Sequence, residues 1–305
     1  MRVVSLLPSA TEIVHALGVE PVAVSHECDH PPAAADLPSV VETRVDPDAS
    51  SAEINEQVAQ AERGGGVYEL DLEALERLDP DVVVSQGICE VCAVDRVLVR
   101  EAVDELGLDC EVVTTDPHSL GDVFDDIERI GSVLGREDRA AAVVGDLRER
   151  VHRVREATAD VPEAERPRVA VLDWLDPVMV AGHWIPELVE WAGGEYGMAD
   201  HSAESRPREW AEVRDYGPEV LVAAPCGFEL DQTVANLDDL TDRDGFAGLP
   251  AVRTDRAFAM DGHHYVNRPG PRLVETLEYL AGLIHPDRFA EPPVAVVRPL
   301  ARTVA

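Results

Sequence analysis

Short apolar runs alternate with helical segments along nearly the whole chain, and this alternation constrains the fold more than any other feature. The runs with the length of buried strands are Val3–Leu7, Val22–Ser25, Val82–Ser85, Glu111–Thr114, Val169–Leu172, Val220–Ala224 and Phe258–Met260. Because strands that alternate with helices form parallel sheets, the sequence predicts an α/β fold.

One helical region is long enough to join two lobes. The region 120–157 has helical spacing with a break near Gly135, and its second part carries an apolar stripe. The stripe consists of Ala141, Val144, Leu147, Val151 and Val154. A helix of about twenty residues spans roughly 30 Å, close to the diameter of a small domain. We therefore predict an N-terminal lobe (1–118), linking helices (119–159), a C-terminal lobe (160–288) and a loosely attached tail (289–305).

The charge of the chain is extreme. It has 60 acidic residues against 26 basic ones, a formal net charge of -34, and every basic residue is arginine. Such a surface excludes nucleic acid as a partner and is typical of proteins that work in concentrated salt, so we predict a halophilic protein. The alternative, a docking surface for a cationic partner, is less favoured because the acidic residues are spread along the whole chain.

The start of the chain and its cysteines bear on location. The first predicted strand begins at Val3 without a charged and apolar leader before it, and no apolar run is long enough to span a bilayer. These features predict a cytoplasmic protein without membrane insertion, or an extracellular membrane-associated one if translation starts upstream. Five cysteines, an odd number, in a reducing compartment favour metal, cofactor or redox use over a disulfide framework.

Three cysteines lie just past predicted strands. Cys28 follows the strand near Val22, and Cys89 and Cys92 follow the strand Val82–Ser85. In an open α/β sheet, ligands bind at the carboxyl ends of the strands, so the sequence predicts a soft-ligand or cofactor site there. Cys110 precedes its strand, at the opposite edge, and is predicted to be a core residue.

The Cys89-x-x-Cys92 pair leaves several interpretations open. Two thiolates at this spacing can chelate one zinc ion, with Cys28 and a histidine as further ligands. The pair could also contact the cobalt of a corrinoid or act as a redox pair at a helix start. The structural alternative is two small buried side chains at the beginning of a helix.

Three stretches of the sequence resemble a known family. The start of the chain, Arg2-Val3-Val4-Ser5-Leu6-Leu7-Pro8-Ser9-Ala10-Thr11-Glu12, resembles the helical-hinge (class III) substrate-binding proteins of cobalamin and iron-siderophore ABC importers. The stretches 173–187 and 267–272 are most similar to members described as cobalamin-binding. The resemblance covers residues 2 to about 287. It implies two Rossmann-like lobes with mostly parallel sheets, joined by a long rigid helix, and a ligand held between them.

The resemblance also implies which residues contact the ligand. One wall of the implied cleft would carry Pro8, Ser9, Ala10, Cys28, Cys89, Glu90 and Cys92. The other wall would carry Trp174, His183, Trp184, Cys226, His263, His264 and Tyr265, and Arg268 could hold a propionamide or carboxylate. Aromatic faces suit the flat, partly apolar surface of a corrin. For His263 and His264, a structural hydrogen-bonding role is the alternative.

These observations predict a binding protein without chemistry of its own. Its ligand would be cobalamin or a related corrinoid, and its partner an ABC importer permease. The alternative is a metal-binding protein or metal-dependent enzyme in which Cys28, Cys89, Cys92, Cys226, His263 and His264 hold zinc, iron or cobalt. In that case Glu27 or Glu90 would supply a base.

Overall fold

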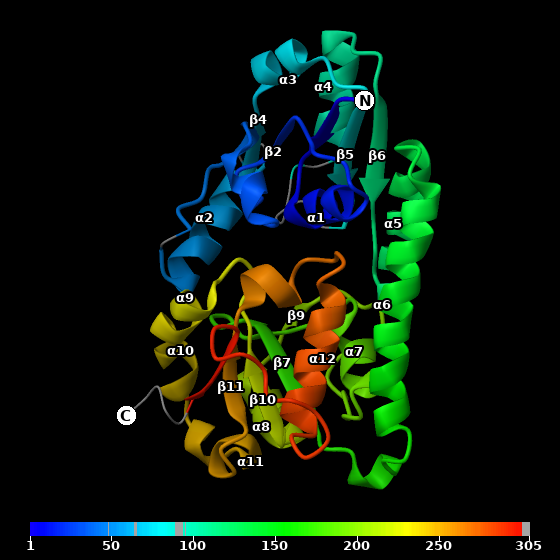
Figure 1. Ribbon diagram of the computed structural model, residues 1–305. Helices are drawn as coiled ribbons and strands as arrows, with labels where there is room; N and C mark the ends of the chain where they lie inside the picture. The colour runs from blue at the N-terminus through cyan, green and yellow to red at the C-terminus, as the bar shows by residue number, and fades with distance from the viewer. Residues whose placement is uncertain (48, 64–65, 89–93, 95, 301–305) are drawn as a thin grey trace. The chain divides into compact units, whose positions relative to one another are not determined.

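The computed structural model describes residues 1–47, 49–63, 66–88, 94 and 96–300, and its chain divides into two compact lobes (Figure 1). The first lobe comprises Met1–Ala49, Glu53–Asp146 and Pro269–Pro271. The second comprises Ser50–Ala52, Leu147–Arg268 and Arg272–Ala305. Each lobe is a mixed α/β unit with its own sheet, and the strand pairs of the two sheets together are mostly parallel, which confirms the predicted fold class.

The sheet of the first lobe has the strand order β4-β3-β2-β1-β5-β6. Its strands are β1 (Val3–Ser5), β2 (Ala23–Ser25), β3 (Ser39–Thr43), β4 (Tyr68–Leu70), β5 (Val82–Gln86) and β6 (Glu111–Thr115). All neighbours are parallel except β3 and β4, which are antiparallel. The order reverses between β1 and β5, and a reversal of this kind marks the usual ligand position in open α/β sheets.

Three helices of the first lobe, α1, α3 and α5, begin where the sequence offers a cap or a proline. The helices of this lobe are α1 (Pro8–Ala16), α2 (Ser51–Arg63), α3 (Leu72–Leu78), α4 (Arg96–Leu106) and α5 (Leu120–Val133), with a 3-10 turn, η1 (Pro32–Asp36). Asp71 accepts a hydrogen bond from the amide of Ala74 at 2.8 Å and starts α3. Ser119 and Asp122 form a capping box at the start of α5. Cys110 packs partly buried against the core of this sheet, as predicted, and burial raises the pKa of its thiol.

The sheet of the second lobe has the order β12-β11-β10-β7-β8-β9. Its strands are β7 (Val169–Trp174), β8 (Met179–Val180), β9 (Arg206–Pro207), β10 (Val220–Ala223), β11 (Ala257–Met260) and β12 (Val297–Pro299). The central strands β7, β10 and β11 are parallel neighbours, so their carboxyl ends lie at one edge of the sheet. The outer strands pair antiparallel.

Short helices connect the strands of the second lobe. They are α7 (Ile185–Trp191), α8 (Trp210–Tyr216), α9 (Leu230–Ala235), α10 (Asp238–Thr241), α11 (Pro250–Arg253) and α12 (Leu273–Ile284). The 3-10 turns are η2 (Glu163–Glu165) and η3 (Phe246–Gly248), and η4 (Gly262–Val266) is a single π-helical turn. The helix α12 packs beside α7 and contacts η4, and nine of its residues are buried (Figure 1).

The helix α6 (Glu137–Thr158) belongs to both lobes, because the boundary between them falls at Asp146. One residue of the apolar stripe predicted for this helix is wrong. Val144, Leu147, Val151 and Val154 are buried as expected, but the stripe begins at the buried Ala140, whereas Ala141 is exposed. None of the described helices is long and apolar enough to cross a membrane.

The prediction of a loosely attached tail is wrong. The strand β12 pairs antiparallel with β11, with Val297 opposite Met260. Val296, Val297 and Leu300 are buried, so the apolar residues between the prolines extend the sheet and cover the edge of β11. The prolines in this segment hid the strand, because proline is usually a signal of irregular structure.

Candidate functional site

In the first lobe, the predicted contacts closest to β1 lie in the first turn of α1. Pro8 is half-buried and opens the helix, where its missing amide costs no hydrogen bond. The side chains of Ser9 and Ala10 are buried, at 4% and 0% exposure. The turn therefore presents mainly backbone and the Pro8 ring at this edge of the sheet.

Cys28 lies inside a chain of buried hydroxyl groups. Its sulfur is 3.1 Å from Oγ1 of Thr11, and the Thr11 hydroxyl donates to Oγ of Ser5 at 2.8 Å. Ser5 in turn donates to the carbonyl oxygen of Leu7 at 3.4 Å. With Cys28 only 3% exposed, the thiol helps to hold the loop after β2 against α1. Cys89, Glu90 and Cys92 lie outside the described residues, so the predictions for them remain predictions.

In the second lobe, several predicted residues come together at one edge of the sheet. Trp174 ends β7, Cys226 follows β10 and His263 follows β11, and these three strands are adjacent. The indole of Trp174 is half-buried, 5.3 Å from the ring of Phe228, and donates to the carbonyl oxygen of Asp176 at 3.1 Å. The edge therefore carries an aromatic ring that is fixed by neighbours but still partly accessible.

Trp184, which the resemblance predicts as a ligand contact, is mostly buried in the second lobe. Its side chain is 5% exposed, and its indole nitrogen donates to the carbonyl oxygen of Val266 at 2.9 Å. It therefore fastens the end of η4 to α7 from inside the lobe. His183 is half-buried beside it, with ring centres 5.4 Å apart, and its backbone is held in the left-handed region at φ 51°.

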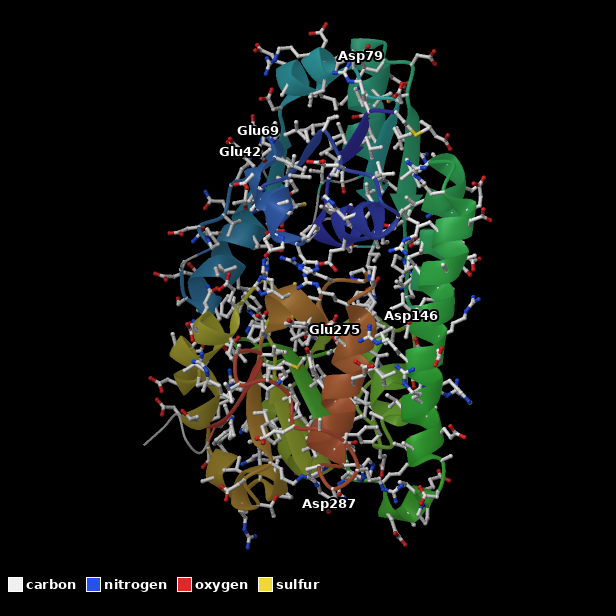
Figure 2. All side chains as sticks on the ribbon, viewed as in Figure 1. Glu42, Glu69, Asp79, Asp146, Glu275 and Asp287 are labelled. Carbon is white, nitrogen blue, oxygen red and sulfur yellow. The ribbon has the colours of Figure 1, made fainter. Side chains whose placement is uncertain are left out.

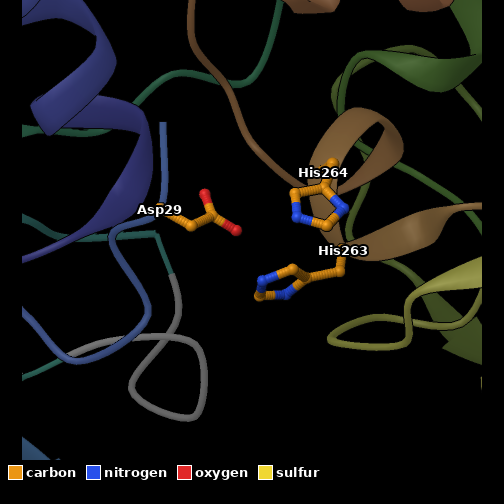
Figure 3. A group of neighbouring side chains, drawn as sticks. All are labelled: Asp29, His263 and His264. Carbon is orange, nitrogen blue, oxygen red and sulfur yellow. The ribbon is translucent and has the colours of Figure 1, made fainter. Parts of the chain in front are cut away.

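The turn η4 orders the two neighbouring histidines. Asp261, which is 6% exposed, accepts hydrogen bonds from the amide and from Nδ1 of His264, at 2.8 and 2.7 Å. A carboxylate on Nδ1 fixes the ring orientation and leaves the lone pair of a neutral imidazole on Nε2. Figure 3 shows His263 and His264 side by side on this turn, and it also draws Asp29, which follows Cys28 in the first lobe.

Two arginines support the aromatic and imidazole groups of this edge. Arg268 is 5% exposed and donates from its guanidinium to Nε2 of His263. The Arg272 guanidinium lies 5.4 Å from the centre of the Tyr265 ring, which also meets Tyr279 edge-on. Burial raises the pKa of the half-buried Tyr265. The predicted residues Arg268 and Tyr265 thus belong to one cluster with His263.

The described residues give no support for a thiolate metal centre. Neither Cys28 nor Cys226 belongs to a described group of three or more His, Cys, Asp and Glu side chains within metal-ligand reach of one another. The sulfur of Cys226 is half-buried after β10, and its amide donates to the carbonyl oxygen of Asp173 at 2.9 Å.

Asp173 is the residue of this edge that the sequence analysis did not single out. Its carboxyl group is buried at the end of β7 and accepts a hydrogen bond from the Ser205 hydroxyl. Burial raises its pKa from 3.8 to about 6, against the opposing effect of Ser205. The sequence signal was an acidic residue at the end of the apolar run Val169–Leu172.

Comparison with known proteins decides the family. The model of the family described as "Periplasmic binding protein" matches residues 3–263. The chain belongs to this family. As a periplasmic binding protein it is a substrate-binding protein of the ABC-transporter type, which confirms the predicted resemblance and the prediction that it is not an enzyme.

Individual relatives of this periplasmic binding protein carry more specific names. An uncharacterized ABC transporter substrate-binding lipoprotein, YvrC, of Bacillus subtilis is 24% identical over 95% of this chain and 82% of its own. A cobalamin-binding protein of Halobacterium salinarum is 28% identical over 73% of this chain and 58% of its own. The crystal structure of a periplasmic heme-binding protein from Pseudomonas aeruginosa superposes with a TM-score of 0.72 at 22% identity, covering 98% of this chain and 97% of the other.

The family also corrects the predicted location. The expectation of a cytoplasmic protein is wrong, because the matching family is periplasmic and one relative is named as a lipoprotein. Metal or redox use of the cysteines was favoured on the assumption of a reducing compartment, and that assumption no longer holds.

Proposed function

We propose that this periplasmic binding protein binds cobalamin or a closely related corrinoid outside the cytoplasm and delivers it to an ABC importer. One observation carries the proposal. The carboxyl edge of the second-lobe sheet presents Trp174 from the end of β7, and His263, His264 and Tyr265 from the single turn η4. The name of the relative from Halobacterium salinarum supports the same ligand class.

The chemistry of this edge suits a corrinoid. A corrin is broad and flat, and its faces are partly apolar, so it packs well against aromatic rings such as those of Trp174 and Tyr265. Its periphery carries amides, which need hydrogen-bonding groups. His264, held by Asp261, and Arg268 supply such groups nearby. In the first lobe, Pro8 and Ser9 stay predicted contacts.

Metal binding by the thiols is not part of the proposal. Cys28 is engaged in the hydroxyl chain with Thr11, and Cys226 lies in no described cluster of metal-ligating side chains. The cobalt of a corrinoid arrives with the ligand, so the protein itself needs no resident metal site.

Ligand titration tests the proposal. Purified protein in concentrated salt is titrated with cyanocobalamin and, separately, with hemin, and binding is followed by calorimetry and by quenching of tryptophan fluorescence. We expect saturable binding of one cyanocobalamin, with hemin binding at least ten-fold weaker, and a loss of about ten-fold or more in affinity for Trp174→Ala.

Trp191→Ala is the matched control. Trp191 ends α7 and stacks under the guanidinium of Arg155 at 4.9 Å, so its removal should leave the affinity unchanged. Tight binding of hemin without cyanocobalamin binding would transfer the proposal to heme-type ligands, and absence of both would refute it.

A further inference from the structure

We propose that Asp173 is a positioning residue for the ligand-binding edge of the second lobe, and that this edge binds its ligand in the form in which the Asp173 carboxyl carries a proton. The inference rests on the proposed function. It adds a proton-linked control of affinity that neither the family nor the relatives' names contain.

The surroundings of the Asp173 carboxyl favour its neutral form. The residue is 8% exposed, and its carboxyl group accepts a hydrogen bond from the Ser205 hydroxyl and a weaker one from its own backbone amide. The carboxyl oxygen Oδ1 is buried without a hydrogen-bond partner among the described residues. A buried carboxylate needs several donors or a cation to offset its lost hydration, so its pKa is raised to about 6 by burial.

The groups that face Asp173 supply no compensating charge. In the loop after β10, the backbone amide of Cys226 donates to the Asp173 carbonyl oxygen, and in the segment before β9 the Ser205 hydroxyl donates to the carboxyl. The titratable neighbour is Tyr196, whose hydroxyl donates to the carbonyl oxygen of Ala181 at 2.6 Å. Burial, and then the charge of Asp173, raise the pKa of Tyr196, so it stays neutral.

Arg208 is the cation that acts on Tyr196, and its guanidinium is engaged elsewhere. Arg208 acts to lower the pKa of Tyr196, but burial and the charge of Asp173 outweigh it. Its guanidinium donates to the carbonyl oxygen of Met198 at 2.7 Å and pairs with Glu212 at 3.5 Å. The Asp173 carboxyl is therefore left with two neutral partners among the described residues, the Ser205 hydroxyl and its own backbone amide.

The Asp173–Ser205 contact connects the strand that carries Trp174 with the loop that holds the start of α7. Ser205 also accepts the amide of Gly182 at 3.0 Å, and the amide of His183 donates to the carbonyl oxygen of Ala203 at 2.5 Å. A Cβ atom on Gly182 would lie 2.2 Å from that same Ala203 oxygen. The segments 182–184 and 203–205 are therefore packed too closely to admit even one more methyl group.

From this loop the connection continues to η4. Trp184 follows directly and binds the carbonyl oxygen of Val266 at the end of the turn that carries His263 and His264. Ionisation of Asp173 draws water or new donors to the buried carboxylate, and the packed 182–184 and 203–205 segments must separate to admit them. The position of Trp174 relative to η4 then loosens, and the affinity falls.

The test is a pH profile of affinity. The dissociation constant of cyanocobalamin is measured from pH 5 to pH 8 at constant salt for the wild type, Asp173→Asn and Ser205→Ala. For the wild type we expect an affinity about ten-fold lower at pH 8 than at pH 5.5, with proton uptake on binding. Asp173→Asn imitates the protonated acid and should keep the low-pH affinity throughout, whereas Ser205→Ala should bind more weakly at every pH.

Asp126→Asn is the control. Asp126 is another buried acid with a raised pKa, caused first by burial, but it lies in α5 and pairs with Arg129, so its substitution should leave the wild-type profile intact. A profile for Asp173→Asn parallel to that of the wild type overturns the inference.

A ligand-free measurement separates this inference from the proposed function. Carbon-13 NMR of the carboxyl groups, with Asp173→Asn identifying the Asp173 signal, should show titration near pH 6. Titration below pH 4.5 overturns the inference whatever the ligand. If Asp173 titrates near pH 6 but the protein binds no corrinoid at any pH, the proposed function is refuted. The proposed dependence of corrinoid affinity on this proton is then refuted as well.

Discussion

Asp173 should make the stability of the protein depend on pH in an unusual direction. Its pKa in the folded state, about 6, lies above the ordinary value of 3.8, so the folded state holds this proton more tightly than the unfolded state. The corresponding stability is fully present below pH 4 and is lost as the pH rises through 6. At about 1.4 kcal/mol per pKa unit, the loss amounts to roughly 3 kcal/mol.

Urea denaturation of the wild type and Asp173→Asn between pH 4 and pH 8 measures this effect. The difference in unfolding free energy between them should shift by about 3 kcal/mol in favour of the variant as the pH rises. Asp122→Asn should change the unfolding free energy with pH in the opposite direction. Although partial burial acts to raise the pKa of Asp122, hydrogen bonds from Ser119 and from the backbone lower it, so its contribution is lost as the pH falls. A constant difference for Asp173→Asn would contradict the prediction.

A second prediction at this scale concerns Gly262, the first residue of η4. A Cβ atom there would lie 2.2 Å from the carbonyl oxygen of Pro225 and 2.5 Å from that of Ala224, both backbone atoms. Gly262→Ala must push η4 away from the loop after β10, at a cost of about 1–3 kcal/mol in stability and with a loss of ligand affinity. Thermal denaturation and cyanocobalamin titration measure the two effects.

Gly248→Ala is the matched control, because a Cβ atom on Gly248 meets nothing within 4 Å. Equal melting temperatures for the two variants would show that η4 has room to move.

The sequence could locate much of the candidate site but not the roles of its residues. Trp174 and His263 could be placed at one edge because parallel strands bring their carboxyl ends together. The burial of Trp184 could not be predicted, since it depends on the carbonyl oxygen of Val266, 82 residues away. The environment of Asp173 likewise depends on Ser205, on a segment that shows no regular pattern in the sequence.

Among the elements, the antiparallel pair β3 and β4 carries an unfavourable contact that leads to a testable prediction. Glu42 and Glu69 are directly opposite in register, and Figure 2 shows them together on the first lobe. Like charges at opposed positions destabilise a strand pair by up to about 1 kcal/mol, and the Arg44 guanidinium, 3.4 Å from Glu69, offsets only part of this.

Glu42→Gln should therefore raise the melting temperature at low salt, and the gain should shrink as salt screens the repulsion. Differential scanning calorimetry at 0.1 and 2 M KCl would measure it. Asp79→Asn is a suitable comparison, because Asp79 ends α3 in a left-handed conformation that asparagine also adopts. A gain that is independent of salt would mean that Glu42 acts through packing.

At the same scale, element length decided what could be predicted. The central strands β1, β5, β7 and β10 were found because each is a continuous apolar run, which is how a strand buried on both faces appears in a sequence. The strands β8 and β9 have two residues each, and tertiary contacts define them more than local preference does. In α6, the sequence could not distinguish Ala140 from Ala141 as the buried residue. Alanine is common on both the buried and the exposed face of a helix, so its position does not mark the buried face.

For the whole molecule, we expect the charge of -34 to determine the salt conditions under which the two lobes stay folded. Acidic side chains cover both lobes, including the labelled Asp79, Asp146, Glu275 and Asp287 (Figure 2). Local ion pairs such as Arg150–Glu278, at 2.6 Å, relieve only part of the repulsion, because the acidic residues outnumber the basic ones by more than two to one. We expect dissolved ions to screen the rest of the repulsion.

The melting temperature should therefore rise steeply with salt. Electrostatic interactions extend over about 10 Å at 0.1 M salt but only about 3 Å at 1 M, so most of the screening gain should be complete near 1 M KCl. Sucrose at equal osmolality is the control. It is excluded from the protein surface and so stabilises the folded state, but it does not screen charges. If KCl and sucrose raise the melting temperature equally, the acidic surface does not limit stability. A gain specific to KCl that is larger at pH 8 than at pH 5 would identify carboxylate repulsion as its cause, because carboxyl groups begin to take up protons at the lower pH.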